Sequence, residues 1–203
     1  MRFLPAGPSA LLVELEDQDA VFSLMAAIAR RRASGWQRGL ADVVPGARTV
    51  LLDGLADPGA TATELAGWTL PAPAVCDGPL VEIPCRYDGP DLASVARCWG
   101  VPEHDVARIH SSLGHRVAFC GFAPGFAYLV GLGTLPEVPR LGTPRPLVET
   151  GSVALAGSYT GVYPRPSPGG WQIVGHTDAV LWDLGRDPPA LLGPGTRVRF
   201  VAA

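Results

Sequence analysis

The sequence Gly121-Phe-Ala-Pro-Gly-Phe126 opens a stretch, residues 121–177, whose composition decides the expected fold and site. These 57 residues contain eleven glycines and eight prolines. Glycine and proline weaken the interiors of helices and strands, so an ordinary core does not need them at this density. They are expected where the backbone turns sharply or lies close to a ligand or a partner. We therefore predict a working surface made of turns that are held on strands.

Short strands are predicted within this stretch and on both sides of it. The apolar patterns place them at residues 116–122, 152–156, 159–163, 172–174, 180–183 and 197–201. Many short strands joined by Gly- and Pro-rich turns are typical of a barrel or a sandwich. Ahead of them we expect a strand over 80–87 and two short helices. Asp91 is expected to cap the first helix and Gly100 to end it, while Pro102 suits the first position of the second.

The first 70 residues predict a separate, smaller unit. A buried strand at 10–15 is followed by a helix that Asp17 or Asp19 can cap, then by strands at 40–44 and 49–52 and a helix at 61–68. This order favours a small α/β sandwich. The segment 71–79 is rich in helix and strand breakers. We therefore predict an α+β protein with an N-terminal domain at 1–78 and a barrel domain at 79–203.

The overall composition excludes several classes of function. The chain has 203 residues, of which 47% are apolar and 17% charged, as expected of a globular protein. Its net charge is 16 − 19 = −3, which excludes the basic surface of a nucleic-acid-binding protein. It contains no lysine, which excludes a Schiff-base lysine and a P-loop lysine. No signal peptide and no apolar run of about 18 residues is present, so we expect a cytoplasmic protein without a membrane association.

The cysteines and acidic residues do not predict a metal site. Cys76, Cys85, Cys98 and Cys120 match no paired zinc signature, and we interpret them as reduced thiols of the core. No set of His, Asp and Glu has the spacing of metal ligands.

Three side chains are candidates for chemistry on their residue types alone. Arg145 follows Pro144 among turn residues, where a guanidinium can bind a carboxylate through two hydrogen bonds or form a surface salt bridge. His110, at a predicted helix end, can serve as a general base near neutral pH or as a core or capping residue. His176 ends a predicted strand and can donate to an oxyanion or be merely exposed.

Two tyrosines and a glycine pair complete the candidate set. Tyr159 and Tyr163 lie on one face of a predicted strand, where they line a pocket or fill the barrel core. Gly169-Gly170 lets backbone amides approach an anion, or forms a tight hairpin. No serine lies in a Gly-x-Ser-x-Gly context, so a nucleophile elbow is not predicted.

Several motifs occur in an order that resembles one protein family. The segments are Gly121–Leu129, Pro144-Arg145, Gly151–Val153, Leu155–Gly157, Thr160-Gly-Val-Tyr-Pro164, Ser167-Pro-Gly-Gly-Trp-Gln172 and Gly175-His-Thr177, with a final loop and strand at 186–201. They resemble subunit 1 of the allophanate hydrolase and carboxyltransferase family, which includes the B subunit of 5-oxoprolinase and the sporulation-kinase inhibitor KipI. The resemblance is dense from residue 80 onward. The sequence departs from the usual family pattern at Leu141, Tyr159 and His176, among others.

The resemblance implies a cyclophilin-like β-barrel behind a small α/β domain. It also implies a companion subunit 2, itself a homologous barrel protein, and a third subunit. Together they would open 5-oxoproline to glutamate at the expense of ATP, with ATP bound by the complex rather than by this chain alone. This chain would then be a cyclic-amide hydrolase subunit that is inactive by itself. The alternatives are a KipI-type inhibitor of a histidine kinase and a subunit of an allophanate hydrolase or urea carboxylase system, in which biotin takes part.

The resemblance and the residue types together give a predicted site. His110, Arg145 and Tyr163 are the expected catalytic residues: Arg145 would hold the substrate carboxylate or developing phosphate charge, and His110 would move a proton. The expected substrate-binding residues come from the motif turns and strands, namely Phe122, Pro124, Thr160, Gly169, Gly170 and His176.

Overall fold

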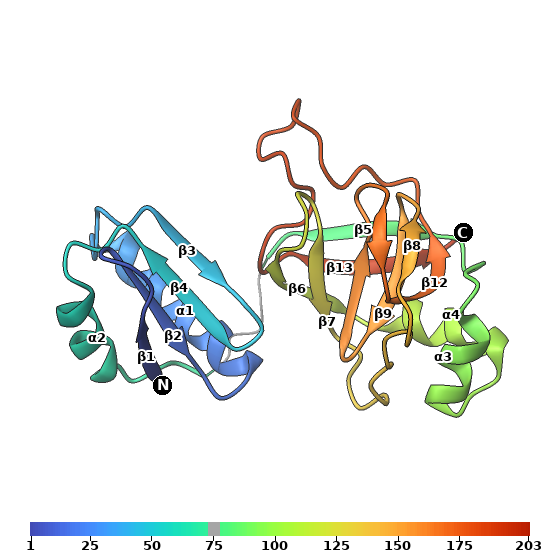
Figure 1. Ribbon diagram of the computed structural model, residues 1–203, viewed down its shortest axis with the longest axis horizontal. Helices are drawn as coiled ribbons and strands as arrows, with labels where there is room; N and C mark the ends of the chain where they lie inside the picture. The colour runs from blue at the N-terminus through green and yellow to red at the C-terminus, as the bar shows by residue number, and fades with distance from the viewer. Residues whose placement is uncertain (73–77) are drawn as a thin grey trace. The chain divides into compact units, whose positions relative to one another are not determined.

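The computed structural model describes residues 1–72 and 78–203 (Figure 1). The chain divides into two compact units, Met1–Cys76 and Asp77–Ala203. Residues 73–77 lie outside the described residues, and they include Cys76 and the middle of the breaker-rich segment at 71–79. The domain limits inferred from the sequence, 1–78 and 79–203, therefore stay a prediction.

The N-terminal unit is a four-stranded antiparallel sheet with two helices. Its sheet has the order β1-β2-β4-β3. The elements are β1 (Arg2–Pro5), β2 (Ala10–Glu14), α1 (Gln18–Ala33), β3 (Asp42–Pro45), β4 (Thr49–Asp53) and α2 (Pro58–Ala66). Alternate residues of β2 and β4, such as Val13 and Leu52, point to one face, where they form a core with Leu24 and Ile28 of α1. The unit is therefore one sheet whose buried face is covered by helices.

Local signals explain the helix starts in this unit. Asp17 caps α1 as predicted, because its carboxylate accepts a hydrogen bond of 2.8 Å from the Ala20 backbone N–H. The helix expected at 61–68 instead runs from Pro58 to Ala66, because Asp57 caps it and Pro58 supplies the favoured first residue. Strand β1 was not predicted. Its four residues are too few to show a period.

The C-terminal unit contains a seven-stranded, barrel-like sheet of order β12-β9-β10-β7-β6-β13-β5. An isolated bridge between Arg86, just after β5, and His176 of β12 brings the two outer strands together. The α+β fold class and the barrel-like C-terminal unit are thereby confirmed. The elements are β5 (Leu80–Cys85), α3 (Leu92–Trp99), α4 (Glu103–Ser112), β6 (His115–Cys120), β7 (Ala127–Val130), β8 (Arg145–Val148), β9 (Ser152–Ala156), β10 (Tyr159–Val162), β11 (Ser167–Gly169), β12 (Gln172–His176) and β13 (Arg197–Ala202).

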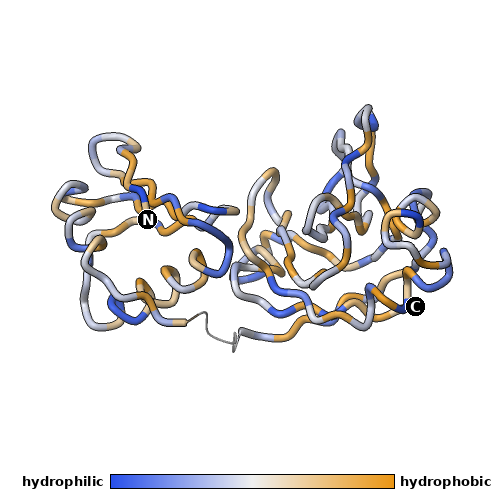
Figure 2. Tube along the Cα trace, turned by 90° about the horizontal axis from the view of Figure 1, so that it is seen from below, coloured by the Kyte–Doolittle hydropathy of each residue, from blue (hydrophilic) through white to orange (hydrophobic). Residues whose placement is uncertain are grey.

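Two packing features position the rest of this unit. Helices α3 and α4 contact each other and lie against β12 and β13 (Figure 1), and Gly100 ends α3 in the left-handed conformation with φ 69°, as predicted. The short strands β8 and β11 pair with each other outside the main sheet. Figure 2 shows apolar and hydrophilic stretches interspersed along the chain of both units.

Three sequence expectations fail in this unit. The strand predicted at 180–183 does not form, and only an isolated bridge joins Trp182 to Ala190. Pro102 precedes α4 as its N-cap instead of occupying its first position. Cys85 is a buried thiol as expected, but Cys120 is exposed and Cys98 only half-buried.

Within residues 1–72 and 78–203, each helix is too short or too polar to span a lipid bilayer.

Candidate functional site

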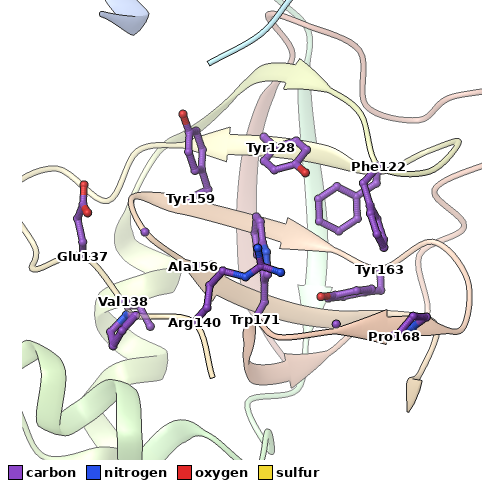
Figure 3. Close-up of a pocket in the computed structure, with 14 residues that line it drawn as sticks. Phe122, Tyr128, Glu137, Val138, Arg140, Ala156, Tyr159, Tyr163, Pro168 and Trp171 are labelled. Carbon is purple, nitrogen blue, oxygen red and sulfur yellow. The ribbon is translucent and has the colours of Figure 1, made fainter. Parts of the chain in front are cut away.

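A cavity of the C-terminal unit opens on the face formed by β7, β10 and the loops beside them. Its volume is about 610 Å³. Figure 3 shows Phe122 and Tyr163 at one end of this pocket and Glu137 and Val138 at the other. The lining residues are Phe122, Phe126, Tyr128, Glu137, Val138, Pro139, Arg140, Ala156, Gly157, Tyr159, Tyr163, Pro168, Gly169 and Trp171. The lining is mainly aromatic and apolar, with one cation and one anion.

The pocket floor is a network of aromatic rings in edge-to-face contact. The ring centroid of Phe126 lies 5.4 Å from those of both Tyr163 and Trp171, and Tyr128 lies 5.5 Å from Trp171. Gly161 of β10 makes this packing possible, because a Cβ there would lie 2.8 Å from a Phe126 ring carbon. The aromatic floor is therefore a stiff surface.

Gly169 likewise leaves room for the side chain of Tyr163. A Cβ at Gly169 would lie 2.2 Å from the Tyr163 hydroxyl oxygen, so only glycine leaves room for it. The hydroxyl in turn accepts a hydrogen bond from the Trp171 backbone N–H. Gly169 thus serves close packing. The Gly-Gly pair leads from β11 to β12, which pair with different strands, so it is not a tight hairpin.

The tyrosine hydroxyls at this site stay protonated at neutral pH. Burial raises the pKa of Tyr128, with Arg140 acting in the opposite direction. Burial also raises the pKa of Tyr159, and the nearby Glu137 carboxylate adds to the effect. Burial likewise raises the pKa of Tyr163. The pocket therefore offers neutral hydroxyl groups that can donate or accept hydrogen bonds.

Arg145 does not line this pocket, because its guanidinium is engaged elsewhere. Its Nη2 lies 2.8 Å from Asp91 Oδ1 in a salt bridge that is largely removed from solvent. The other Asp91 oxygen accepts a hydrogen bond of 2.6 Å from the Ile173 backbone N–H. Asp91 directly precedes α3, as expected, but its side chain makes no hydrogen bond that caps the helix. Its carboxylate instead binds Arg145 of β8 and the Ile173 backbone of β12. The sequence left two roles open for Arg145, a substrate contact and a salt bridge. The structure favours the salt bridge, because the guanidinium is paired with Asp91.

His110 is a core residue. Its side chain is fully buried, with Nδ1 2.7 Å from the Tyr87 hydroxyl and Nε2 3.1 Å from Thr160 Oγ1. Burial lowers its pKa well below the usual value, and His115 beside it lowers the pKa further. A neutral, enclosed imidazole cannot exchange protons with a ligand in the pocket. We therefore take the core alternative for His110 and do not propose it as a general base.

The other predicted residues fall into two groups. Tyr163, Gly169 and Phe122 line the pocket together. The sequence did not predict that these three residues would lie close to one another. The remaining four lie outside its lining: Pro124 is exposed, Thr160 is buried against His110, Gly170 is buried, and His176 lines a smaller cavity with Arg86 and Asp178.

Sequence reasoning missed the pocket's own cation, Arg140. Like Arg145, it follows a proline in a turn-rich segment, so the same signal marks both arginines. Trp171 and Tyr128 lie within the motifs but were given no role, and Glu137 was not considered. Only the folded arrangement separates the arginine that faces the pocket from the one paired with Asp91.

The pocket belongs to a known kind of domain. The family described as "Carboxyltransferase domain, subdomain C and D" matches residues 1–192, and the chain belongs to this family.

Curated relatives give a more specific likeness. The chain is 52% identical over 127 residues to the B subunit of 5-oxoprolinase from Escherichia coli O157:H7, which is 60% of this chain and 57% of that relative. It is 43% identical over 125 residues to the B subunit of 5-oxoprolinase from Bacillus subtilis (strain 168), covering 60% of this chain and 52% of the relative. The match thus spans just over half the length of these curated relatives.

Solved structures support the fold over nearly the whole chain. A crystal structure of TTHA0988 superposes with a TM-score of 0.77 at 35% identity, covering 96% of this chain and 40% of that one. The Kluyveromyces lactis urea carboxylase superposes with a TM-score of 0.71 over 99% of this chain and 21% of the enzyme. At 20% identity, the second likeness shows the fold alone.

Proposed function

We propose that this chain is the B-type subunit of an ATP-dependent 5-oxoprolinase, which opens the lactam of 5-oxoproline to give glutamate. The observation that carries the proposal is the 52% identity to the B subunit of a 5-oxoprolinase. The structure adds a pocket of suitable chemistry, with a stiff aromatic floor, neutral hydroxyl groups and one guanidinium. Small-molecule sites are usually concave and mostly apolar, with few polar groups.

The pocket suits binding and orientation of a small ring more than catalysis by itself. Among the described residues that line it, none is a histidine or cysteine, so its proton-transfer groups are limited to Glu137 and the hydroxyl groups of Tyr128, Tyr159 and Tyr163, which stay protonated at neutral pH. Its volume of about 610 Å³ also leaves space beside a molecule as small as 5-oxoproline. We propose that companion subunits complete the site and that this chain is inactive alone.

We propose that ATP does not bind to the pocket of this chain, since the described lining residues offer few groups for a triphosphate. The pocket contains a single guanidinium, the chain has no lysine, and Gly169 and Gly170 are both buried. A phosphate cradle normally combines exposed backbone amides with a lysine or several arginines. We therefore propose that ATP binds to another part of the complex.

Reconstitution tests this function. The chain is combined with its companion subunits, 5-oxoproline and ATP, and glutamate is measured over time. We expect glutamate to accumulate only when this chain, its companions and ATP are all present. A well-folded complete complex that forms no glutamate would contradict the proposal. Inhibition of a histidine kinase, or carboxyl transfer from biotin to urea, would then identify the alternative function.

A further inference from the structure

Arg140 occupies the pocket wall on a backbone that is fixed on both sides. Val138 pairs with Gly157 through two hydrogen bonds, of 3.0 and 2.7 Å. On the other side of Arg140, the Leu141 N–H donates to the Gly170 carbonyl at 2.8 Å. These bonds tie the segment 138–141 to the chain after β9 and before β12.

A buried glutamine secures the residue just before Arg140. The Gln172 side chain is 3% exposed, and its amide Nε2 donates a hydrogen bond of 2.7 Å to the Pro139 carbonyl. Proline also restricts the backbone at this point. The backbone of Arg140 is thus held from three directions, and its side chain extends into the pocket in front of Trp171 (Figure 3). A guanidinium carried on such a support loses less freedom when it binds a ligand.

The charge of Arg140 is not used within the described part of the chain. Arg145 pairs with Asp91, Arg86 with Asp178 and Arg199 with Glu82. No salt bridge or side-chain hydrogen bond joins Arg140 to another described residue. Glu137 also lines the pocket, but toward the end away from Tyr163 (Figure 3). The guanidinium is therefore available to an anion that enters the cavity.

The surface behind Arg140 is suited to a flat ring. Trp171 and Phe126 are 8% and 2% exposed, and their mutual edge-to-face contact holds them in place. Pro139 and Pro168 add further apolar surface to the lining. A planar ring gains dispersion contacts on such a surface without ordering new side chains. A guanidinium beside an aromatic floor matches a small ring that carries a carboxylate.

We propose that Arg140 binds the carboxylate of 5-oxoproline through two parallel hydrogen bonds while the lactam ring lies against the Trp171 side of the aromatic floor. This inference rests on the proposed function, since that function supplies the ligand. 5-Oxoproline has a small ring, which suits the aromatic floor, and a carboxylate, which suits the guanidinium. The planar guanidinium of arginine matches the geometry of a carboxylate. The remaining volume is open to the groups that perform the ring opening.

Steady-state kinetics of the reconstituted complex test the proposal. The variants are Arg140→Gln, which removes the charge, and Arg140→Lys, which keeps it but removes the fork. We expect Arg140→Gln to raise KM for 5-oxoproline by roughly 10- to 100-fold, which is the effect of losing one charged hydrogen-bonded contact. The KM of Arg140→Lys should lie between those of the wild type and Arg140→Gln. The matched control is Arg165→Gln, an exposed arginine outside the pocket lining, which should leave KM unchanged.

A ligand without a carboxylate separates a binding role from a structural one. 2-Pyrrolidinone has the same ring, and its inhibition constant is measured against each complex. The wild-type complex should bind it much more weakly than 5-oxoproline, and Arg140→Gln should abolish this preference. A structural defect would weaken both ligands alike. Wild-type KM and an intact preference in Arg140→Gln would overturn the assignment of Arg140 while leaving the proposed function in place.

A direct binding measurement tests the role of Arg140 even if the reconstituted complex forms no glutamate. Isotope-labelled intact chain, assembled with its companion subunits, is titrated with 5-oxoproline, and NMR shifts of the pocket residues are followed. Shifts at Trp171 that disappear in Arg140→Gln support the binding assignment even though the proposed function has failed. Absence of any shift at millimolar 5-oxoproline in the inactive complex would overturn both.

Discussion

Asp91 is the residue around which the packing near the pocket is organised. It accepts hydrogen bonds from Arg145 and from the Ile173 backbone, and thereby joins the start of α3 to β8 and β12. The Arg145 guanidinium also lies 3.4 Å from the Trp171 carbonyl, directly behind the aromatic floor. Arg145 therefore supports the site from outside the cavity.

Replacement of Arg145 should reduce stability. In Arg145→Ala the largely buried Asp91 carboxylate keeps only the Ile173 N–H as a partner, at a cost of roughly 1–3 kcal/mol in the free energy of unfolding. Urea denaturation of the wild-type and variant chains measures this difference. Asp91→Asn is the companion variant, because it keeps an acceptor for Ile173 but loses the charge. Unchanged stability combined with a large rise in KM would restore the substrate-binding role first expected of Arg145.

The buried histidines make stability depend on pH. Burial lowers the pKa of His115 to about 4 and that of His110 well below 6.5. At pH values above about 6.5, the pKa of histidine in the unfolded chain, both histidines are neutral in the folded and unfolded states. Protonation of these histidines then takes nothing from the free energy of unfolding. As the pH falls below 6.5, the unfolded chain takes up protons that the folded chain does not, so stability declines toward pH 4.

Denaturation midpoints at pH 7, 6 and 5 measure this decline. The expected result is a progressive loss of stability between pH 6.5 and 5. His104→Gln, a change at an exposed histidine, should leave the profile unaltered. A flat profile across this range would contradict the buried, neutral arrangement of His110 and His115.

Individual residues show what the sequence could and could not predict. Tyr163 and Gly169 were expected at a pocket and line one, because both lie in motifs whose turns and strands are local. The role expected of Arg145 stays a prediction, although the structure pairs its guanidinium with Asp91. The partner of Arg145 is 54 residues earlier in the chain, and no local pattern reveals that pairing.

At the scale of single elements, β10 shows how glycine builds the site. Tyr159 lines the pocket from this strand and Tyr163 from the residue just after it, while Gly161 between them accommodates the rings of Phe126 and Trp171. The strand expected at 159–163 forms over Tyr159–Val162. The function of Gly161 emerges only when the neighbouring strands place their aromatic side chains against it.

Gly161→Ala should disturb the aromatic floor. The added methyl group would lie 2.8 Å from Phe126 and 3.0 Å from Trp171, and overpacking of this kind costs about 1–3 kcal/mol. Thermal unfolding measures the loss, and KM of the complex should rise with it. Gly142→Ala is the matched control, because no atom lies within 4 Å of a Cβ placed there. Equal melting temperatures for the two variants would contradict the packing described for β10.

Errors in the predicted strands also have physical causes. Strands β8 and β11 have four and three residues with proline inside, so their pattern resembles turns. The segment 180–183 begins with three consecutive apolar residues, a run that favours a buried strand, but the chain opposite it contains Pro188 and Pro189, which have no N–H to donate. It therefore forms a single bridge in place of a ladder.

At the scale of the whole molecule, the two units have separate cores. The core of Met1–Cys76 includes Val13, Val50 and Leu65, and that of Asp77–Ala203 includes Leu129, Leu155 and Phe200. No described core cluster draws residues from both units. Each unit therefore has the apolar interior that independent folding requires.

A fragment of residues 78–203 should fold by itself. We expect cooperative thermal unfolding and a dispersed NMR spectrum, with pocket signals like those of the full chain. A fragment of residues 1–72 serves as the reciprocal sample and should also unfold cooperatively. Soluble but non-cooperative fragments would show that the two units depend on each other for stability.

The binding of 5-oxoproline by the aromatic pocket is tested most directly by a crystal structure of the reconstituted complex with this ligand. The account predicts the lactam ring against Trp171 and both carboxylate oxygens within about 3 Å of the Arg140 guanidinium nitrogens. Ligand bound elsewhere in the complex, with Arg140 paired to a companion subunit or pointing to solvent, would contradict it.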